Sequence, residues 1–213
     1  AQNLLPEEGL TFKVAATRNE AKRGRQSPLR GISNFALQLE QNSLEELISA
    51  SKNGEFTSLE QIRMAYAHMA MLDPQALAES DAWRHFSTFD ELYAARDSFF
   101  DVWTSNNPEA LLRHLKSLPR NGGQQDNSLY FSRVWGRMDP AAAAKHFDEL
   151  VELRNLWVDE TQPNYVAYSN HLLYHWVRQD LSAARHWVEN YPNPGARQVF
   201  EKQIEKHQRN LSP

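Results

Sequence analysis

Two stretches of the chain each place an Arg, an Asp and a His within about twelve residues. WGRMDPAAAAKHF runs from Trp135 to Phe147, and WVRQDLSAARHW runs from Trp176 to Trp187. A carboxylate beside an imidazole is the arrangement used for general acid–base catalysis, and His with carboxylates can bind a metal ion. The same recurrence has a second explanation, in which these residues build one structural unit more than once.

A third stretch extends the pattern and favours the structural explanation. In each copy a Trp lies five residues before a helix start, an Ala lies two residues after that start, and a basic residue, a His and a large apolar residue follow. We align Trp103, Pro108, Ala110, Arg113, His114 and Leu115 with Trp135, Pro140, Ala142, Lys145, His146 and Phe147, and with Trp176, Leu181, Ala183, Arg185, His186 and Trp187. Met69, Pro74 and Ala76 form a weaker fourth copy. Successive starts lie 34, 32 and 41 residues apart, a spacing typical of helical-hairpin repeats.

The pattern predicts the parts of one hairpin. A first helix ends near the Trp, an Asp or Asn caps the second helix, and the Ala lies where the two helices cross closely. The second helices are expected to end near Leu118, Leu150 and Tyr191. Neighbouring hairpins would be about 10 Å apart, so the recurring His could not share one metal ion. The sequence leaves open whether the pairs Arg113–His114, Lys145–His146 and Arg185–His186 face solvent, a neighbouring hairpin or a partner.

Helix signals occupy the chain from residue 28 onward. Ser43 with Glu46, Ser58 with Gln61, and Thr88 with Glu91 fit the capping box. Breakers such as Asn53-Gly54 separate the segments, and no stretch alternates apolar and polar residues as a strand would. The sequence therefore predicts an all-α protein.

The period and the small residue at the crossing resemble those of tetratricopeptide-like helical-repeat proteins. The usual tetratricopeptide signature places Trp early in the first helix and Pro at the end of the second, whereas here Trp ends the first helix and Pro opens the second. The W-x4-P-x-A pattern is also similar to repeats of bacterial exported proteins. The resemblance implies a right-handed superhelix of stacked antiparallel helical hairpins. We expect residues 28–213 to form a single α-solenoid of about five hairpins plus a C-terminal helix, and residues 1–27 to form an extended or mobile leader.

Catalytic and cofactor sites have little support in the sequence. His171 and His175 are spaced as two zinc ligands on one helix face would be, but Leu172 stands where the HExxH pattern has its Glu. The chain has no Cys, which excludes thiolate nucleophiles and Cys-bound zinc. It also lacks a GxSxG motif, a phosphate-binding loop and a dinucleotide fingerprint. We therefore predict no enzymatic site, no cofactor and no metal, with His171 and His175 as the weak metal candidates.

Tyr and Arg on the expected first helices are the candidate contacts for a partner, since these residue types dominate interface energetics. Concave solenoid faces often bind peptides, so we expect some of these side chains to line such a face. The alternative is that the Tyr residues pack between helices. The candidates are Tyr66, Arg96, Tyr130, Arg133, Arg137, Tyr165, Tyr168 and Tyr174.

The predicted function is that of a non-enzymatic interaction module or scaffold that binds a protein or peptide. The alternative is an accessory superhelical domain of a larger enzyme or of a membrane-anchored sensor, for example one related to the cell envelope. The net charge of −4 gives no general attraction to nucleic acid, and no run of about eighteen apolar residues predicts membrane insertion. Ala1 without an initiating Met weakly favours an exported chain over a cytoplasmic one.

Overall fold

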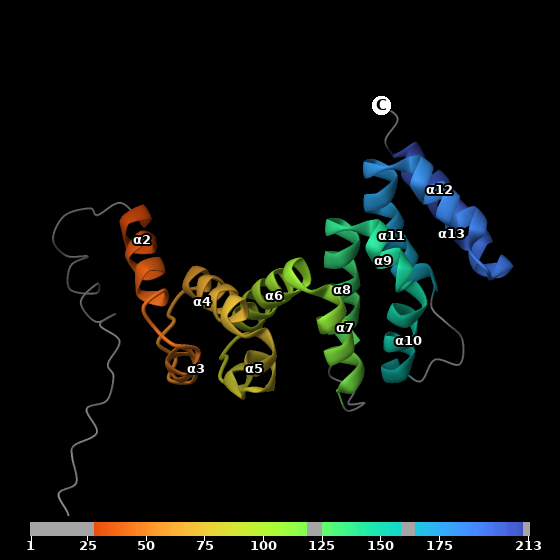
Figure 1. Cartoon of the computed structure of the whole chain (residues 1–213). Coiled ribbons are helices and arrows are strands. Elements are labelled where there is room, and N and C mark those ends of the chain that lie inside the picture. The colour runs from red at the N-terminus through yellow and green to blue at the C-terminus, as the bar shows by residue number, and fades with distance from the viewer. Residues whose placement is uncertain (1–27, 119–124, 159–164, 211–213) are drawn as a thin grey trace, which may run out of the picture. The chain divides into compact units, whose positions relative to one another are not determined.

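The structure is a computed structural model that describes residues 28–118, 125–158 and 165–210 (Figure 1). Every regular element within these ranges is helical, which confirms the all-α prediction. The predicted leader, residues 1–27, lies outside the described residues. No helix in the described ranges is long and apolar enough to cross a membrane. The elements are α2 (Pro28–Leu39), α3 (Leu44–Lys52), α4 (Leu59–Leu72), α5 (Pro74–Glu79), the 3-10 turn η1 (Ala82–Arg84), α6 (Phe89–Asn106), α7 (Pro108–Ser117), α8 (Gln125–Met138), α9 (Pro140–Lys145), α10 (Phe147–Val158), α11 (Tyr165–Gln179), α12 (Leu181–Asn190) and α13 (Pro194–Arg209).

The contacts of the chain divide it into two compact units, and the boundary between Phe99 and Phe100 falls inside α6. In the first unit α4 packs against α2, α3 and α5, and η1 packs against α3. Its core is built around Tyr66 and Met69, both fully buried. The extent of a single solenoid over residues 28–213 stays a prediction.

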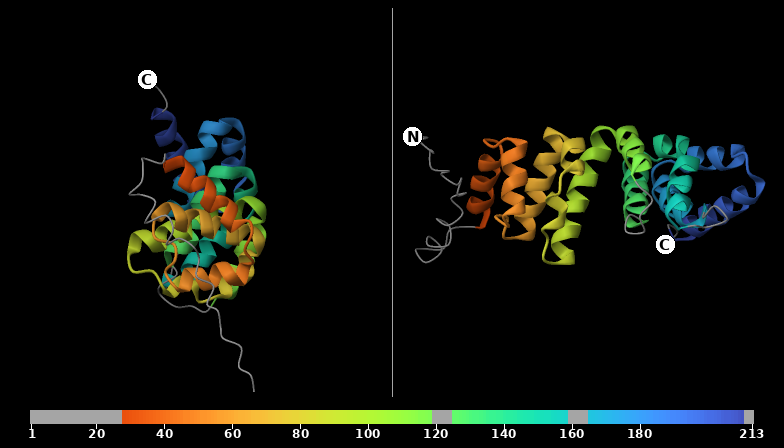
Figure 2. Two further views of the ribbon diagram at one scale, coloured as in Figure 1. Left: turned by 90° about the vertical axis from the view of Figure 1, so that its left-hand side faces the viewer. Right: turned by 90° about the horizontal axis from the view of Figure 1, so that it is seen from below.

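The second unit is centred on α11, which packs between α8 and α13 (Figures 1 and 2). Helices α8 and α11 approach closely at Gly136, where a Cβ would stand 3.3 Å from the Cα of Leu172. A side chain at this position would push against the backbone of α11, so the absence of one lets the two helices lie side by side. The residues on their shared outer side are consequently brought near one another.

Four helix junctions have the same backbone geometry. At each, one Asp or Asn ends the first helix and caps the second, with φ between −157° and −144° and ψ between 79° and 98°. Its N–H donates to the carbonyl four residues earlier, at 2.7–3.1 Å, and its side chain accepts the N–H of the Ala two residues after the helix start. These junctions are Met69–Asp73–Ala76, Trp103–Asn107–Ala110, Trp135–Asp139–Ala142 and Trp176–Asp180–Ala183.

The Ala at these junctions does not occupy the close crossing, so the prediction of a small residue there is wrong; the buried position is the next one, which is Leu in two junctions and Ala in the other two. Ala110, Ala142 and Ala183 are only half-buried. Their backbone N–H groups donate to the capping Asp or Asn. One residue on represents a turn of about 100° around the helix, and it is this next residue that faces the interior. The buried residues are Leu77, Leu111, Ala143 and Ala184, each at most 1% exposed.

The other predicted helix boundaries are confirmed in part. Ser43 forms the complete capping box with Glu46, and the Asn53-Gly54 turn has Gly54 at φ 68°, a backbone conformation that favours glycine. Helices α7 and α12 end close to the predicted Leu118 and Tyr191. The predicted end at Leu150 is wrong, because the chain breaks only briefly at His146 and then continues as α10 to Val158. Leu150, Val151 and Leu153 are buried, and their burial favours the longer helix.

Candidate functional site

The recurring His packs on the recurring Trp of its own unit. The rings of His114 and Trp103 have centroids 5.1 Å apart, and those of His146 and Trp135 have centroids 5.2 Å apart at an angle of 28°. The Trp rings are 3% and 1% exposed, so each His covers a buried indole. In the same copies Asn107 and Asp139 cap helices. These residues therefore serve packing and capping rather than an acid–base pair.

His146 also belongs to a small polar contact between α7 and α10. Its Nδ1 lies 2.8 Å from Oε1 of Glu149, and the other carboxylate oxygen of Glu149 accepts from Lys116 Nζ at 2.8 Å. The hydrogen bond from Lys116, followed by the contact with His146, holds the pKa of Glu149 below its usual value. The group is partly exposed, so its contribution is a modest tie between two helices.

The third copy corrects our alignment of the basic–His pairs. The ring that packs on Trp176 is that of Trp187, with centroids 5.7 Å apart, and His186 is exposed. Trp187 lies eleven residues after its Trp, as His114 and His146 do after theirs. The alignment of Arg185 and His186 with Arg113 and His114 is therefore wrong by one residue, because Arg185 and His186 lie one position earlier in their unit. In the third copy Val188 takes the place of Leu115 and Phe147, and it is 1% exposed.

The side chain before the packed ring is exposed in every copy. It is Arg113 in the first, Lys145 in the second and His186 in the third. The recurring pair is thus split: the second residue covers its own Trp, and the first faces solvent. Arg185, one residue earlier in the third copy, is also exposed and donates to Gln208 of α13 at 3.1 Å.

Three of the Tyr candidates for partner binding are buried, and Tyr66 and Tyr168 are the most deeply buried, whereas Tyr130 is 9% exposed. Tyr66 is 0% exposed and shares a hydrogen bond of 2.9 Å with Ser51, and burial raises the pKa of its phenol to about 12. Tyr168 is 2% exposed and shares a hydrogen bond of 3.0 Å with Ser128. A partner cannot reach either ring in this fold, so both are packing residues.

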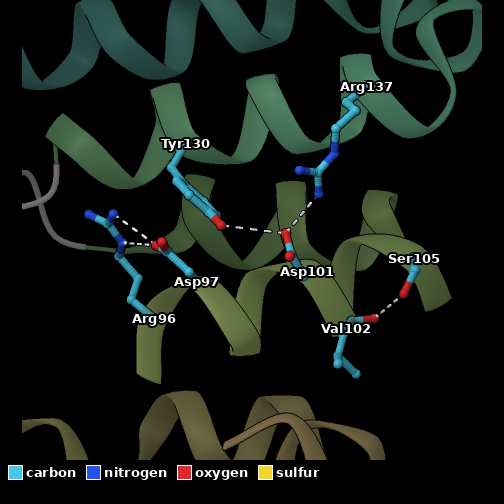
Figure 3. Close-up of polar contacts among 7 residues, drawn as sticks. All are labelled: Arg96, Asp97, Asp101, Val102, Ser105, Tyr130 and Arg137. Atoms are coloured by element: carbon cyan, nitrogen blue, oxygen red, sulfur yellow. Dashed lines mark hydrogen bonds and ion pairs between the residues drawn. The ribbon is translucent and has the colours of Figure 1, made fainter. Parts of the chain in front are cut away.

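Two further candidates have contacts of their own. Tyr165 packs with Phe147, Tyr191 and Phe200 in an aromatic cluster of the second unit. Arg96 belongs to the first unit, where it pairs with the neighbouring Asp97 at 2.9 Å (Figure 3).

The remaining four candidates lie on α8 and α11. Tyr130, Arg133 and Arg137 recur at intervals of three and four along α8, and Tyr174 lies on the adjacent α11. Residues at this spacing share one helix face. The matching face of α11 also carries His171, His175 and Arg178, which the partner prediction did not include. We call the set the basic face: Tyr130, Arg133, Arg137, His171, Tyr174, His175 and Arg178.

The two rows correspond through the repeat. Positions 130, 133 and 137 of α8 match positions 171, 174 and 178 of α11, each 41 residues later. This is the distance between the helix starts Pro140 and Leu181, so the sequence held the signal that would have added His171 and Arg178. The correspondence was missed because Tyr and Arg were sought by residue type rather than by position in the unit.

Charge on the basic face is only partly balanced. Arg137 pairs with Asp101 at 3.2 Å, and the Tyr130 hydroxyl donates to the same carboxylate at 3.4 Å (Figure 3). Arg133 lies over the ring of Tyr130, 5.0 Å from its centroid. Arg178 lies 3.7 Å from the centroid of Tyr174 and donates to the carbonyl of that residue at 2.9 Å. Within the described part of the chain, neither Arg133 nor Arg178 has a carboxylate partner.

The two His of this face are surrounded by cations. Burial, followed by the charge of Arg133, lowers the pKa of His171. Burial also lowers the pKa of His175, and the charges of Arg137 and Arg178 add to the effect. No group of three or more metal-binding side chains occurs in the ranges that the structure describes. The Arg charges oppose a cation between His171 and His175, whereas they favour an anion.

Four side chains of the basic face are accessible to a partner from solvent. Tyr174 is 40% exposed, and Arg133, Arg137 and Arg178 are exposed. A separate shallow pocket of about 380 Å³ lies between α11 and α12, where Trp176, Trp187 and Pro192 contribute to a mostly apolar lining. The basic face is the stronger candidate site, because it combines three exposed Arg with the partly exposed Tyr174.

Comparison with known proteins adds no assignment: no protein-family model, no curated protein and no solved structure matches this chain. Its function therefore has to be inferred from the geometry and charge of its own residues.

Proposed function

We propose that this protein is a non-enzymatic helical-repeat module that binds a protein or peptide on the basic face. The four junctions of equal geometry support the repeat, since units that turn in the same way can stack on one another. On this proposal the hairpins form a right-handed, tetratricopeptide-like superhelix. Helices α8 and α11 are first helices of consecutive hairpins, and in such stacks one helix of each hairpin lines the binding surface.

One observation carries the proposal: Arg133 and Arg178 are exposed, lack carboxylate partners among the described residues, and stand beside the exposed Tyr174. Arg and Tyr are the residue types most enriched among residues that dominate binding energy. The Arg178 side chain is already held by its contacts with Tyr174. A side chain held in this way loses less conformational entropy when a partner binds.

The proposal is tested by selecting ligands from a displayed library of random peptides. We expect enriched peptides that bind the protein with micromolar dissociation constants, and binding at least about tenfold weaker to the Arg133→Gln/Arg178→Gln variant. The matched control is Arg113→Gln/Arg185→Gln, which removes two exposed Arg from α7 and α12. A selection without enrichment, or peptides that bind both variants equally, would contradict the proposed site.

A further inference from the structure

We infer that the partner presents an acidic, extended segment whose carboxylates pair with Arg133 and Arg178 on the basic face. The inference rests on the proposed function and names the chemistry of the ligand. It depends on charge, on the state of the aromatic rings, and on the distance between α8 and α11.

The charge of this face is opposite to that of the chain. The whole sequence has a net charge of −4, yet three Arg gather on α8 and α11. In the described ranges the carboxylate that contacts them is Asp101, and it is taken up by Arg137 and Tyr130. A guanidinium can form two parallel hydrogen bonds with one carboxylate. Arg133 and Arg178 therefore offer two vacant places for acidic side chains.

The aromatic rings of the basic face favour a peptide over a single-stranded nucleic acid. Sequence-tolerant binding of single strands uses open ring faces on which bases stack. Tyr130 is only 9% exposed and lies under Arg133. Tyr174 has Arg178 over its ring, while His175 and His207 meet it at angles of 89° and 82°. The rings thus support the guanidinium groups and leave little free area for a base.

The distance between the helices suits an extended chain. Their close approach at Gly136 and Leu172 places the axes about 8–10 Å apart, as in ordinary helix packing. In an extended peptide, alternate side chains point to the same side and are separated by about 7 Å. Arg178 matches Arg137 in the register of the two helices, one turn further along than Arg133. Acidic residues at i and i+4, about 14 Å apart in an extended chain, would therefore reach Arg133 on one helix and Arg178 on the other. Asp101 already shows that a carboxylate is accepted beside Arg137.

The test uses a fluorescent peptide of about ten residues in which Glu alternates with Ser. The comparison peptide has Gln in place of every Glu, and binding is followed by fluorescence anisotropy at low salt and at physiological salt. We expect the Glu peptide to bind at least about tenfold more tightly than the Gln peptide, and more weakly as salt increases. Arg133→Gln/Arg178→Gln should reduce this affinity by about tenfold or more, whereas Arg113→Gln/Arg185→Gln should change it less than about threefold.

Each alternative outcome has a separate meaning, provided that circular dichroism and thermal melting show every variant to be folded. Equal affinity for the Glu and Gln peptides would overturn the acidic inference. If library peptides still require Arg133 and Arg178 in that case, the proposed function stands without it. Equal losses in both double variants would show that general charge, rather than this face, attracts the peptide. Tighter binding of a mixed-sequence single-stranded DNA, lost in the Arg133→Gln/Arg178→Gln variant, would replace the peptide by a nucleic acid.

Discussion

The imidazole of His146 lies on the indole of Trp135, with ring centroids 5.2 Å apart and planes 28° from parallel. His114 and Trp103 repeat this relationship at 5.1 Å. A His that recurs beside an Asp in sequence is thereby explained as the cover of a buried Trp. The chemistry suggested by residue types is replaced by packing, and the exposed cations of α8 and α11 remain as the candidate for function.

Trp135→Ala should destabilise the fold strongly. The indole is 1% exposed, and truncating a buried Trp typically costs about 3–5 kcal/mol. His146→Ala should cost less, about 0.5–1.5 kcal/mol, because it removes one aromatic contact and the contact with Glu149 from a partly exposed position. Lys145→Ala is the control, since this exposed side chain should change stability by less than about 0.5 kcal/mol. Urea unfolding followed by circular dichroism measures the three, and equal losses for Lys145 and Trp135 would contradict the packing role.

The corrected alignment of the third unit makes a separate prediction. Trp187 packs on Trp176 and stacks on Phe200 at 5.1 Å, so Trp187→Ala should cost about 2–4 kcal/mol. His186→Ala should change stability by less than about 0.5 kcal/mol, because the residue is exposed. Thermal and urea unfolding distinguish the two. A larger loss at His186 than at Trp187 would restore the original alignment.

The junction residues should act as caps whose chemistry can be exchanged. Asp180→Ala removes the acceptor of the Ala183 N–H and should cost about 0.5–2 kcal/mol. Asp180→Asn should lose less than half as much, since Asn107 occupies the same place in another junction. Unfolding free energies of the two variants, compared with the unchanged protein, provide the measurement. Equal losses would mean that the charge of Asp180, rather than its capping hydrogen bond, matters.

Much of the fold could be predicted because its signals are local. Ser43, Asn107 and Asp139 each act within three residues of themselves, so the helix starts are legible in the sequence. The buried hydroxyls of Tyr66 and Tyr168 instead find their hydrogen-bond partners in Ser51 and Ser128, which are 15 and 40 residues away.

The candidate site was predicted in part for the same reason. The Tyr and Arg of α8 were found by residue type, but the packing of the helices decides which of these side chains a partner can reach. The contribution of α11 depends on the approach of Gly136 to Leu172, a contact between distant parts of the chain. The one-residue shift of Trp187 needed the observed ring contact with Trp176.

The His residues of the basic face should make stability depend on pH. Folding lowers the pKa of His171 and His175 through burial and neighbouring Arg, so between the unfolded and folded pKa values the unfolded chain binds more protons. Stability is then lost as pH falls through about 6.5, the unfolded value, towards the lower folded values.

The double variant His171→Gln/His175→Gln should remove part of this loss. Its unfolding free energy, measured from pH 7.5 to pH 5, should fall less steeply than that of the unchanged protein. The exposed His186 provides the control, and His186→Gln should retain the steeper fall. Parallel curves for the double variant and the unchanged protein would contradict a contribution from these two His.

The single-residue junction also limits how the chain can change in length. Because one Asp or Asn both ends a helix and begins the next, an inserted residue would rotate the following helix by about 100° and turn Ala143 or Ala184 towards solvent. The starts of successive units are 34, 32 and 41 residues apart, yet the five residues from Met or Trp to the start never vary. Insertions and deletions in this chain are thus confined to the stretches between junctions, and those stretches are where added segments could be accommodated without disturbing the fold.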